Sequence, residues 1–295
     1  MARLPTHLSL PWALGACLLA AGCDGPEGGA ESAAEGSETD AEAGSEDAGE
    51  TGELDRDEDG LSDAEEAELG TDPLDKDTDH DNYWDSWERI EGTDPLDPES
   101  RIYTSWWPYN PDKDALEQGT WAGASTEPGT PFPRHLFFDR HGEQVDIYDF
   151  ANFTINPTGA PAYVIVDVSA QWCGPCHSMA YWLGGTISES TAYYRTNYPS
   201  VPDKVHDLRV WWMTFIVEGG DKAAPDLADA STWFEVHPEP QVPVFADVER
   251  IVANHFGGPF YPFLFLLDPE LKFVMWTENS NATAQVLNFV EHEIE

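Results

Sequence analysis

Two cysteines in the second half of this 295-residue chain, Cys173 and Cys176, are separated by only two residues. The other two cysteines, Cys17 and Cys23, lie in or directly after an N-terminal apolar stretch. Proteins braced by disulfides usually carry more of them, so a single close pair in the folded part indicates a working dithiol. At the first turn of a helix, this spacing brings both sulfurs within bonding distance and favours a thiolate on the first. Such a pair can exchange disulfides, with Cys173 attacking and Cys176 resolving the mixed disulfide.

A zinc site is the main alternative for two cysteines at this spacing. A tetrahedral zinc site needs two further ligands, and no other cysteine is available in the folded part. Histidines, beginning with His177 directly after the pair, are the only soft ligands left. The sequence therefore favours redox chemistry over metal binding at this pair.

Two acidic loops form a second group of residues with potential for chemistry, and they share one register. Each has carboxylates at positions 1, 3, 5, 9 and 12 and a backbone carbonyl expected at position 7. The first loop uses Asp55, Asp57, Asp59, Leu61, Asp63 and Glu66, and the second uses Asp77, Asp79, Asp81, Tyr83, Asp85 and Glu88. Because Ca²⁺ takes six to eight oxygen ligands, this spacing predicts one calcium ion in each loop. Gly60 and Asn82 can supply the sharp turn that position 6 requires.

The hexapeptide GTDPLD at residues 70–75 recurs at residues 92–97, with the same shift as the loops. Only about ten residues separate the loops, and they include Gly70 and Pro73, so no full helix of a paired EF-hand fits. From Glu53 to Glu99 the sequence resembles thrombospondin type 3 repeats. The resemblance implies a calcium stalk that is loose without calcium and compact with it. The alternative, a solvated acidic linker, would not repeat its register.

The N-terminus has the features of an export signal. Arg3 and His7 precede an apolar run over residues 8–22, which is short for a membrane span of roughly 20 residues and is typical of a signal peptide. The run ends in small residues before Cys23, which resembles a bacterial lipobox and implies lipidation of Cys23. Ordinary secretory cleavage near Ala21 is the alternative. Both predict an extracytoplasmic protein, and the first predicts a lipid anchor in a bacterial membrane, on the periplasmic or surface side.

The acidic residues are unevenly spread along the chain. The formal charge is −42, and about 30 of the 56 acidic residues fall between Asp24 and Ser100. Phosphate binding needs clustered Lys and Arg, so nucleic acid is excluded as a partner. Residues 23–52 contain no large apolar side chain, and we expect them to form a disordered acidic tether.

Apolar and β-branched runs predict the strands of a globular part. We expect strands at residues 162–168, 208–217, 261–268 and 272–276, a hairpin around His141-Gly142, and helices after Cys176, at 225–234 and at 281–293. The segment DVSAQWCGPC at residues 167–176 resembles the active-site segment of thioredoxins. The resemblance runs from Pro131 to the end, and the hairpin with the lipoprotein signal makes it similar to the TlpA/ResA-type branch. It implies an α/β thioredoxin-like fold, with a central mixed sheet flanked by helices.

This resemblance also implies roles for single residues. Asp167 matches the family's buried acid, which transfers protons to and from Cys176. Pro262 matches the cis-proline that lies against the cysteines and offers backbone to substrates. The remaining residues expected around the site are Trp172, Gly174, Pro175, His177 and Tyr261.

Plainer interpretations exist for three of these residues. Asp167 could be a surface carboxylate at a strand end, and Pro262 an ordinary trans proline, with Pro259 competing for its role. His177 is more simply interpreted as a histidine facing solvent than as a group that tunes the thiolate.

The sequence departs from the thioredoxin pattern in three places. The strand at 208–217 lacks the lysine found near the family's buried acid. Phe263 follows the presumed cis-proline where a small threonine is usual, which predicts a narrower or more apolar substrate groove. Residues 218–256 are longer than the minimal connection and could shape the choice of partner.

Together these patterns divide the chain into a signal peptide (1–22), a tether (23–52), calcium repeats (53–100), a linker (101–130) and a thioredoxin-like domain (131–295). The linker is rich in aromatic residues, among them Trp106, Trp107, Tyr109 and Trp121, which we expect to pack on the core.

The leading functional hypothesis is a membrane-anchored reductase of protein disulfides, with no redox cofactor beyond the cysteine pair and with calcium in the stalk. Its expected partners are substrate proteins with disulfides and a membrane electron donor, which the family resemblance implies. One alternative is a disulfide oxidase or isomerase. The other is a calcium-dependent surface-binding lipoprotein whose thioredoxin-like domain is a passive scaffold.

Overall fold

The computed structural model describes residues 54–256, 260–276 and 281–295. The predicted signal peptide, the lipidation site at Cys23, the tether and Pro259 lie outside the described residues. Within the part that is described, no helix is both long and apolar enough to cross a membrane.

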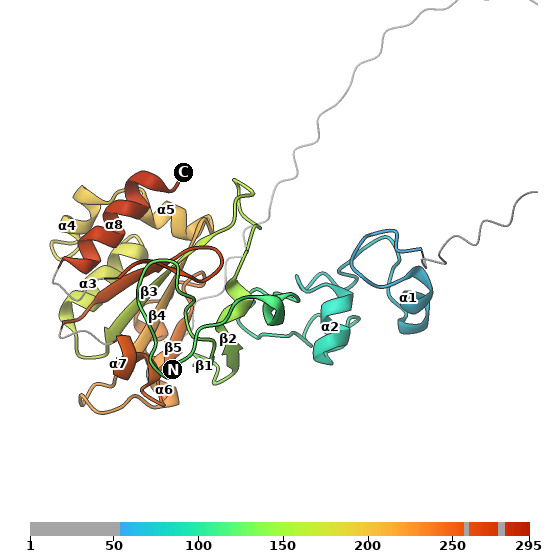
Figure 1. Cartoon of the computed structure of the whole chain (residues 1–295), viewed down its shortest axis with the longest axis horizontal. Helices are drawn as coiled ribbons and strands as arrows, with labels where there is room; N and C mark the ends of the chain where they lie inside the picture. The colour runs from blue at the N-terminus through green and yellow to red at the C-terminus, as the bar shows by residue number, and fades with distance from the viewer. Residues whose placement is uncertain (1–53, 257–259, 277–280) are drawn as a thin grey trace, which may run out of the picture. The chain divides into compact units, whose positions relative to one another are not determined.

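A seven-stranded mixed sheet forms the centre of the globular part, in the order β2-β1-β5-β4-β3-β6-β7 (Figure 1). The strands are β1 Leu136–Asp139, β2 Gln144–Asp146, β3 Tyr163–Ala170, β4 Val210–Glu218, β5 Val244–Ala246, β6 Phe263–Leu267 and β7 Phe273–Met275. Strands β3, β4 and β5 are parallel, whereas β6 pairs antiparallel with β3 and β7 antiparallel with β6. Strands β3 and β4 are mostly apolar and almost entirely buried because both of their faces are covered.

Helices pack on the two faces of this sheet. They are α3 Gly174–Leu183, α4 Ala192–Asn197, α5 Val201–His206, α6 Leu227–Val236, α7 Ile251–Phe256 and α8 Ala282–Glu293. Side chains of α3, α5 and α8, such as Met179, Val205 and Val290, share one core cluster with Ile165 of β3. The succession β3-α3-β4, then the antiparallel pair β6-β7, then α8 is a thioredoxin-like arrangement, so the predicted fold is confirmed.

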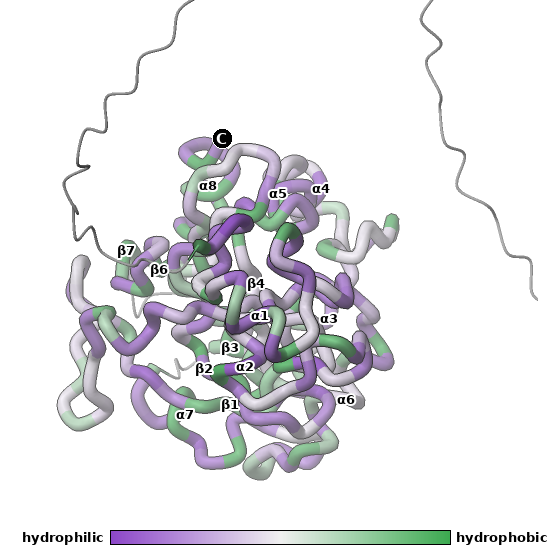
Figure 2. The backbone as a smooth tube through the Cα atoms, turned by 90° about the vertical axis from the view of Figure 1, so that its right-hand side faces the viewer, coloured by the Kyte–Doolittle hydropathy of each residue, from purple (hydrophilic) through white to green (hydrophobic). Residues whose placement is uncertain are grey.

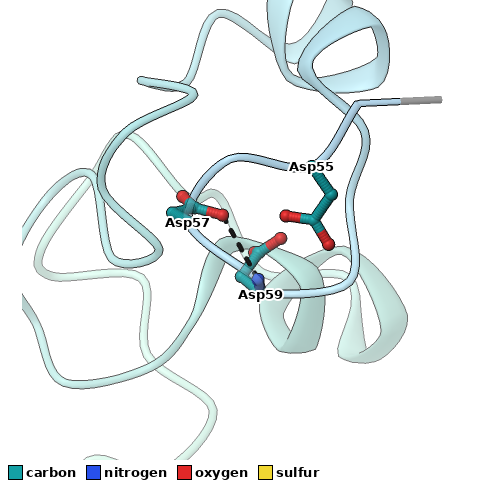
Figure 3. A group of neighbouring side chains, drawn as sticks. All are labelled: Asp55, Asp57 and Asp59. Atoms are coloured by element: carbon teal, nitrogen blue, oxygen red, sulfur yellow. Dashed lines mark hydrogen bonds between the residues drawn. The ribbon is translucent and has the colours of Figure 1, made fainter.

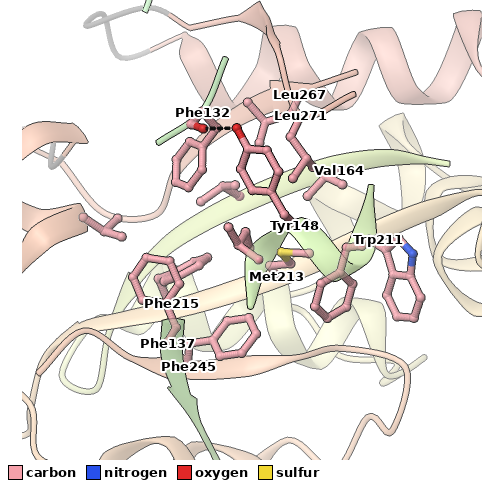
Figure 4. Close-up of a cluster of buried hydrophobic side chains, with 14 of the residues drawn as sticks. Phe132, Phe137, Tyr148, Val164, Trp211, Met213, Phe215, Phe245, Leu267 and Leu271 are labelled. Atoms are coloured by element: carbon pink, nitrogen blue, oxygen red, sulfur yellow. Dashed lines mark hydrogen bonds between the residues drawn. The ribbon is translucent and has the colours of Figure 1, made fainter. Parts of the chain in front are cut away.

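The other face of the sheet carries a large aromatic cluster, drawn in Figure 4. It joins Phe132, Phe137 and Tyr148 with β4 and β5 side chains such as Phe215 and Phe245. The hydroxyl of Tyr148, at a 3-10 helix (Ile147–Phe150), donates to the Phe132 carbonyl over 2.7 Å. In Figure 2 the backbone of the central strands is mostly white to green, and much of the surrounding backbone is purple.

The linker packs on this second face through aromatic side chains. Trp107 is buried, and its Nε1 donates to Asp139 over 3.1 Å, while the buried Tyr103 donates its hydroxyl to Asp149 over 2.6 Å. Tyr109 is also buried and Trp121 packs partly buried, as expected. Trp106 differs, because it is 47% exposed and carries the Arg101 guanidinium on its ring.

Each acidic loop ends in a short helix, α1 Asp63–Leu69 or α2 Asp85–Glu91. Gly70 and Gly92 stop these helices in the left-handed conformation, with φ of 93° and 84°. Because each helix has only seven residues, the prediction that no full EF-hand helix fits between the loops is confirmed.

Candidate functional site

Cys173 and Cys176 form a disulfide at the N-terminus of α3. Cys173 caps the helix, and its sulfur accepts a hydrogen bond from the Cys176 backbone N–H over 3.1 Å. Pro175 lies in the first turn, where its missing N–H costs nothing, and Gly174 beside it is exposed. Both cysteines are at most 2% exposed in this oxidised form. The turn between β3 and α3 thus presents the pair where a helix N-terminus favours a thiolate.

Asp167 lies inside β3 and is buried, so the interpretation as a surface carboxylate is wrong. Its carboxylate accepts hydrogen bonds from Ser169 Oγ at 2.8 Å, Thr214 Oγ1 at 3.2 Å and Trp212 Nε1 at 3.3 Å. The Trp212 ring also contacts Trp182 of α3, so Asp167 lies between the sheet and the helix that carries the cysteines. Burial raises the pKa of Asp167, and the three hydrogen bonds lower it. Burial has the larger effect, so the pKa of Asp167 is raised to about 6.

The peptide bond between Tyr261 and Pro262 is cis, so the interpretation of Pro262 as an ordinary trans proline is wrong. Tyr261 packs against the small core cluster that contains Cys173 and Cys176, so the proline segment lies beside the cysteines. Phe263, the next residue, is 3% exposed and belongs to the aromatic core. The Phe263 ring therefore packs into the core, and the narrower or more apolar substrate groove stays a prediction.

Trp172 lies at the exposed edge of the site, with 42% of its surface accessible. Its ring meets the Tyr261 ring edge-on at 6.0 Å, and its Nε1 donates to Glu218 over 2.8 Å. The Lys222 ammonium lies over the other part of the ring, 4.3 Å from the centroid. Both Glu218 and Lys222 come from the end of β4 and the residues after it, so the long 218–256 segment helps to hold Trp172.

His177 is only half-buried, but both of its ring nitrogens contact protein atoms, which corrects the simpler expectation of a histidine facing solvent. Its Nε2 lies 2.8 Å from the Gln171 carbonyl oxygen, and its Nδ1 lies 2.7 Å from Nε2 of His237. The ring stacks on Trp233 of α6 at 4.7 Å. Sequence reasoning missed Gln171, Trp233 and His237 as partners of His177. Trp233 and His237 lie about 60 positions after His177 in the sequence, within the 218–256 segment, for which the sequence predicted no contact with the site.

In each acidic loop the first three aspartates come together. The carboxylates of Asp55, Asp57 and Asp59 present oxygens within 4.8 Å of one another (Figure 3), and Asp77, Asp79 and Asp81 do the same in the second loop. Gly60 and Asn82 at position 6 have φ of 104° and 79°, which is the predicted left-handed turn. At position 7, Leu61 and Tyr83 donate their backbone N–H groups to Asp59 and Asp81, and both side chains are buried.

The oxygens of these loops have the character of a hard-cation site. Both carboxylate oxygens of Glu66 are buried without a hydrogen-bond partner in the described structure. Buried oxygens in the same state occur on Asp57, Asp63, Asp79, Asp81 and Glu88. Burial, with the neighbouring aspartates, raises the pKa of Glu66 to about 7 and that of Glu88 to about 8. An all-oxygen set of buried, unpaired carboxylates fits Ca²⁺.

The residues at position 9 offer less to a metal ion. Both carboxylate oxygens of Asp85 are bonded by Thr78, through its backbone N–H at 3.0 Å and its hydroxyl at 2.8 Å. Asp63 pairs one oxygen with Arg56 at 2.6 Å and keeps the other free of hydrogen bonds. In twelve-residue calcium loops, position 9 often acts through a water, which these contacts allow.

The two repeats are joined by a contact that the sequence did not indicate. Ser86, at the start of α2, donates its backbone N–H to the Asp59 carboxylate over 3.0 Å. Its hydroxyl donates to the Asp59 backbone carbonyl over 2.7 Å. A position-5 residue of the first loop is thereby fixed by the helix of the second.

Parts of the chain are similar to known proteins. The family model for the bacterial TSP3 repeat matches residues 55–76 and 77–98. No curated protein is significantly similar to the chain.

Solved structures similar to this chain include a thioredoxin-like protein from Bacteroides caccae, with 12% identity over 56% of this chain and 50% of that one and a TM-score of 0.38. This chain therefore spans half the length of that protein. A thiol:disulfide interchange protein from Bacteroides sp. has 18% identity, coverage of 57% and 90%, and a TM-score of 0.36. The exposed lipoprotein thioredoxin of Streptococcus pneumoniae has 18% identity, coverage of 52% and 98%, and a TM-score of 0.33.

The repeats are thus shown by the family model, and the fold by the strand order and connections. Residues 55–98 are two bacterial TSP3 repeats, followed by a thioredoxin-like fold with a disulfide-bonded Cys-X-X-Cys pair at the start of α3.

Proposed function

We propose that this protein is an extracytoplasmic thiol–disulfide oxidoreductase that reduces disulfides of other proteins. The observation that carries the proposal is the disulfide between Cys173 and Cys176 at a helix N-terminus, beside the cis Tyr261–Pro262 peptide. A buried acid, Asp167, lies between the sheet and the same helix. A passive scaffold would have no need for this set of groups around one pair of sulfurs.

In the proposed reaction the reduced pair passes two electrons to a substrate disulfide. The Cys173 thiolate attacks one substrate sulfur, the substrate S–S bond breaks, and the departing sulfur takes up a proton as a thiol. Cys176 then loses its proton and attacks Cys173 Sγ, which releases the second substrate sulfur as a thiol. The disulfide seen in the structure is the end state, and a dithiol partner must return two electrons and two protons.

Asp167 is the proposed acceptor of the Cys176 proton, directly or through one water. Its pKa of about 6 suits this role, because at neutral pH the group is mostly ionised and yet basic enough to take a proton. Ser169, Thr214 and Trp212 hold its carboxylate in place in the absence of the lysine that thioredoxins use nearby.

The remaining parts of the proposal concern position in the cell. We propose that Cys23 is lipidated, that residues 23–52 tether the protein to a bacterial membrane, and that a membrane protein supplies its electrons. The TSP3 repeats bind calcium in this proposal. The aspartates at positions 1, 3 and 5 and the glutamate at position 12 hold the ion in each loop, and the ion's charge offsets their repulsion.

The first test is the reduction potential of the Cys173–Cys176 pair in purified protein, equilibrated in dithiothreitol or glutathione buffers. A potential near that of thioredoxin, about −270 mV, supports a reductase. A potential near roughly −120 mV would make the protein an oxidase and reverse the proposed direction. Failure to form any intramolecular disulfide would leave calcium-dependent surface binding as the main function.

A second test captures substrates. The variant Cys176→Ser keeps the attacking thiol but cannot resolve the mixed disulfide, so in cells it should accumulate disulfide-linked partners. Cys173→Ser is the matched control and should trap few, since the remaining thiol lies inside the helix at its third position and not at the N-cap. Equal trapping by both variants, or none by either, would contradict the assigned order of attack.

A further inference from the structure

A pair of histidines packs on Trp233, which shares a core cluster with the two cysteines, and has no assigned role in the proposed reaction. His177 lies in the second turn of α3, and His237 lies directly after the last residue of α6. Their rings are joined by a 2.7 Å contact between Nδ1 of His177 and Nε2 of His237. Trp233 lies against both rings, at 4.7 Å from His177 and 4.8 Å from His237. The pair thus joins the active-site helix to the 218–256 segment.

When both rings are neutral, the hydrogen bonds determine which nitrogen of each ring carries the proton. A carbonyl oxygen only accepts, so His177 Nε2 must carry the hydrogen that it directs at the Gln171 carbonyl. In the neutral ring, Nδ1 is then an acceptor, and it takes the hydrogen of His237 Nε2. This order leaves His237 Nδ1 as a bare acceptor, and that atom is buried without a hydrogen-bond partner in the described structure.

A proton added to this pair meets an unfavourable environment. If His177 gains it at Nδ1, His237 must turn its hydrogen to Nδ1, where a buried donor finds no partner. The groups facing the two rings are Trp233, the Tyr181 ring and the Gln171 carbonyl. No carboxylate of the described residues lies within salt-bridge distance of either ring. Burial, and then the neighbouring His177, lowers the pKa of His237 to about 4, in agreement with this geometry.

The charge of His177 matters because of its place on the helix. His177 follows Cys173 by four residues, and its backbone N–H donates to the Cys173 carbonyl over 3.1 Å. Cys173 is the N-cap of this helix, so an imidazolium in the adjoining turn would stabilise the Cys173 thiolate by its charge. A stabilised thiolate favours the reduced pair and makes its disulfide a stronger oxidant.

We propose that His237 is a positioning residue that holds His177 as a neutral ring beside Cys173, and so keeps the Cys173–Cys176 pair a reductant. This proposal rests on the proposed function and adds a residue to the same site. The 218–256 segment then has a defined task, since it delivers His237 and Trp233 to the active-site helix.

Two isosteric variants of the full-length protein separate charge from packing. In His237→Glu, the carboxylate accepts from His177 Nδ1 and favours the imidazolium, whereas the amide in His237→Gln leaves the ring neutral. We expect His237→Glu to shift the redox equilibrium with glutathione about tenfold towards the reduced pair. This shift corresponds to a reduction potential about 30 mV more oxidising. We expect His237→Gln to stay near the wild type. The Cys173 thiolate, followed by the pH dependence of its alkylation, should form at lower pH only in His237→Glu.

Nitrogen NMR of the ring atoms tests the same proposal without any substitution. In the wild type at pH 7, both rings should be neutral, with their hydrogens on Nε2. A protonated His177 in the wild type would overturn the proposal, and so would equal potentials in His237→Glu and His237→Gln. These outcomes are distinct from failure of the proposed function, in which the wild-type pair forms no disulfide or is already strongly oxidising. Thermal unfolding of both variants shows whether each is folded before its potential is compared.

Discussion

At the scale of single residues, the buried environment of Asp167 disfavours the charged form of its carboxyl group. Three hydrogen-bond donors surround its carboxylate, but among the described residues it has no salt-bridge partner. Burial outweighs the hydrogen bonds and raises its pKa from 3.8 to about 6. The folded protein therefore holds this proton more tightly than the unfolded chain does. Its ionisation costs stability as pH rises from about 4 to about 6, and the full cost applies above that window.

Asp167→Asn should stabilise the oxidised protein at pH 8. A shift of about two pKa units corresponds to about 3 kcal/mol, of which we expect about 2 kcal/mol to be recovered. The amide can accept from Trp212 and Thr214 with its oxygen, and it can donate to Ser169, whose hydroxyl also accepts. Denaturant unfolding at pH 8 and at pH 4 measures the difference, which should nearly vanish at pH 4. The same gain at both pH values would show that the carboxylate's charge is not its source.

The sequence anticipated the residues of the cysteine turn better than their surroundings. Cys173 and Cys176 could be placed because their spacing follows chain-local rules of turn and helix, and Asp167 and Pro262 could be placed by their resemblance to thioredoxin positions. His237 could not, since its contact with His177 depends on how α6 folds back onto the sheet. No short-range pattern encodes such a contact.

At the scale of elements, the second acidic loop is built into the aromatic core of the thioredoxin-like fold. Tyr83 occupies position 7 of that loop, and its side chain is 2% exposed within the aromatic cluster under the sheet. Its hydroxyl donates to the Trp107 carbonyl over 2.6 Å, and Trp107 is bonded in turn to Asp139. Leu61 has the equivalent position in the first loop and is not part of this cluster. The order of the second loop and the packing of the sheet therefore depend on one another.

Tyr83→Ala should destabilise the thioredoxin-like domain by about 3 kcal/mol or more, because it removes a large buried ring and its hydrogen bond. Tyr83→Phe, which loses only the hydrogen bond, should cost about 1 kcal/mol. Hydrogen exchange of the β3 and β4 amides reports on this domain alone. Leu61→Ala is the matched control and should leave that exchange unchanged. An equal effect of the two alanine variants would mean that Tyr83 does not couple the loop to the sheet.

Long apolar strands were easier to predict than short strands and short helices. The runs that became β3, β4 and β6 were identified because each is almost continuously apolar, as buried central strands are. Strand β5, Val244–Ala246, was missed because three residues after a proline-rich stretch show no period. Helices α4 and α5 were missed for a similar reason, since each has only six residues.

At the scale of the whole molecule, the dominant property is the formal charge of −42. Carboxylates of the repeats lie buried and close together, and their mutual repulsion opposes folding of this segment. A bound cation would remove that repulsion, and an ion that binds only the folded state stabilises it by mass action.

Removal of calcium should therefore loosen the repeats. At calcium concentrations about 100 times the dissociation constant, we expect about 2.7 kcal/mol of stabilisation per site, lost on addition of a chelator. Glu66→Gln and Glu88→Gln should each weaken one site at least about tenfold in calorimetric titrations, since each removes a buried, unpaired ligand. Glu68→Gln is the control, because Glu68 is exposed on the same short helix as Glu66. Heat of binding unchanged in all three variants would contradict the assigned ligands.

The contact between Ser86 and Asp59 has a consequence for how the two loops respond together. Asp59 is a proposed ligand of the first ion, and its side chain and backbone are held by the first turn of the helix that completes the second loop. An ion in either loop would fix part of the framework that the other needs, and this linkage is reciprocal. The pair of repeats would then fill cooperatively, over a narrower range of calcium concentration than two independent loops would.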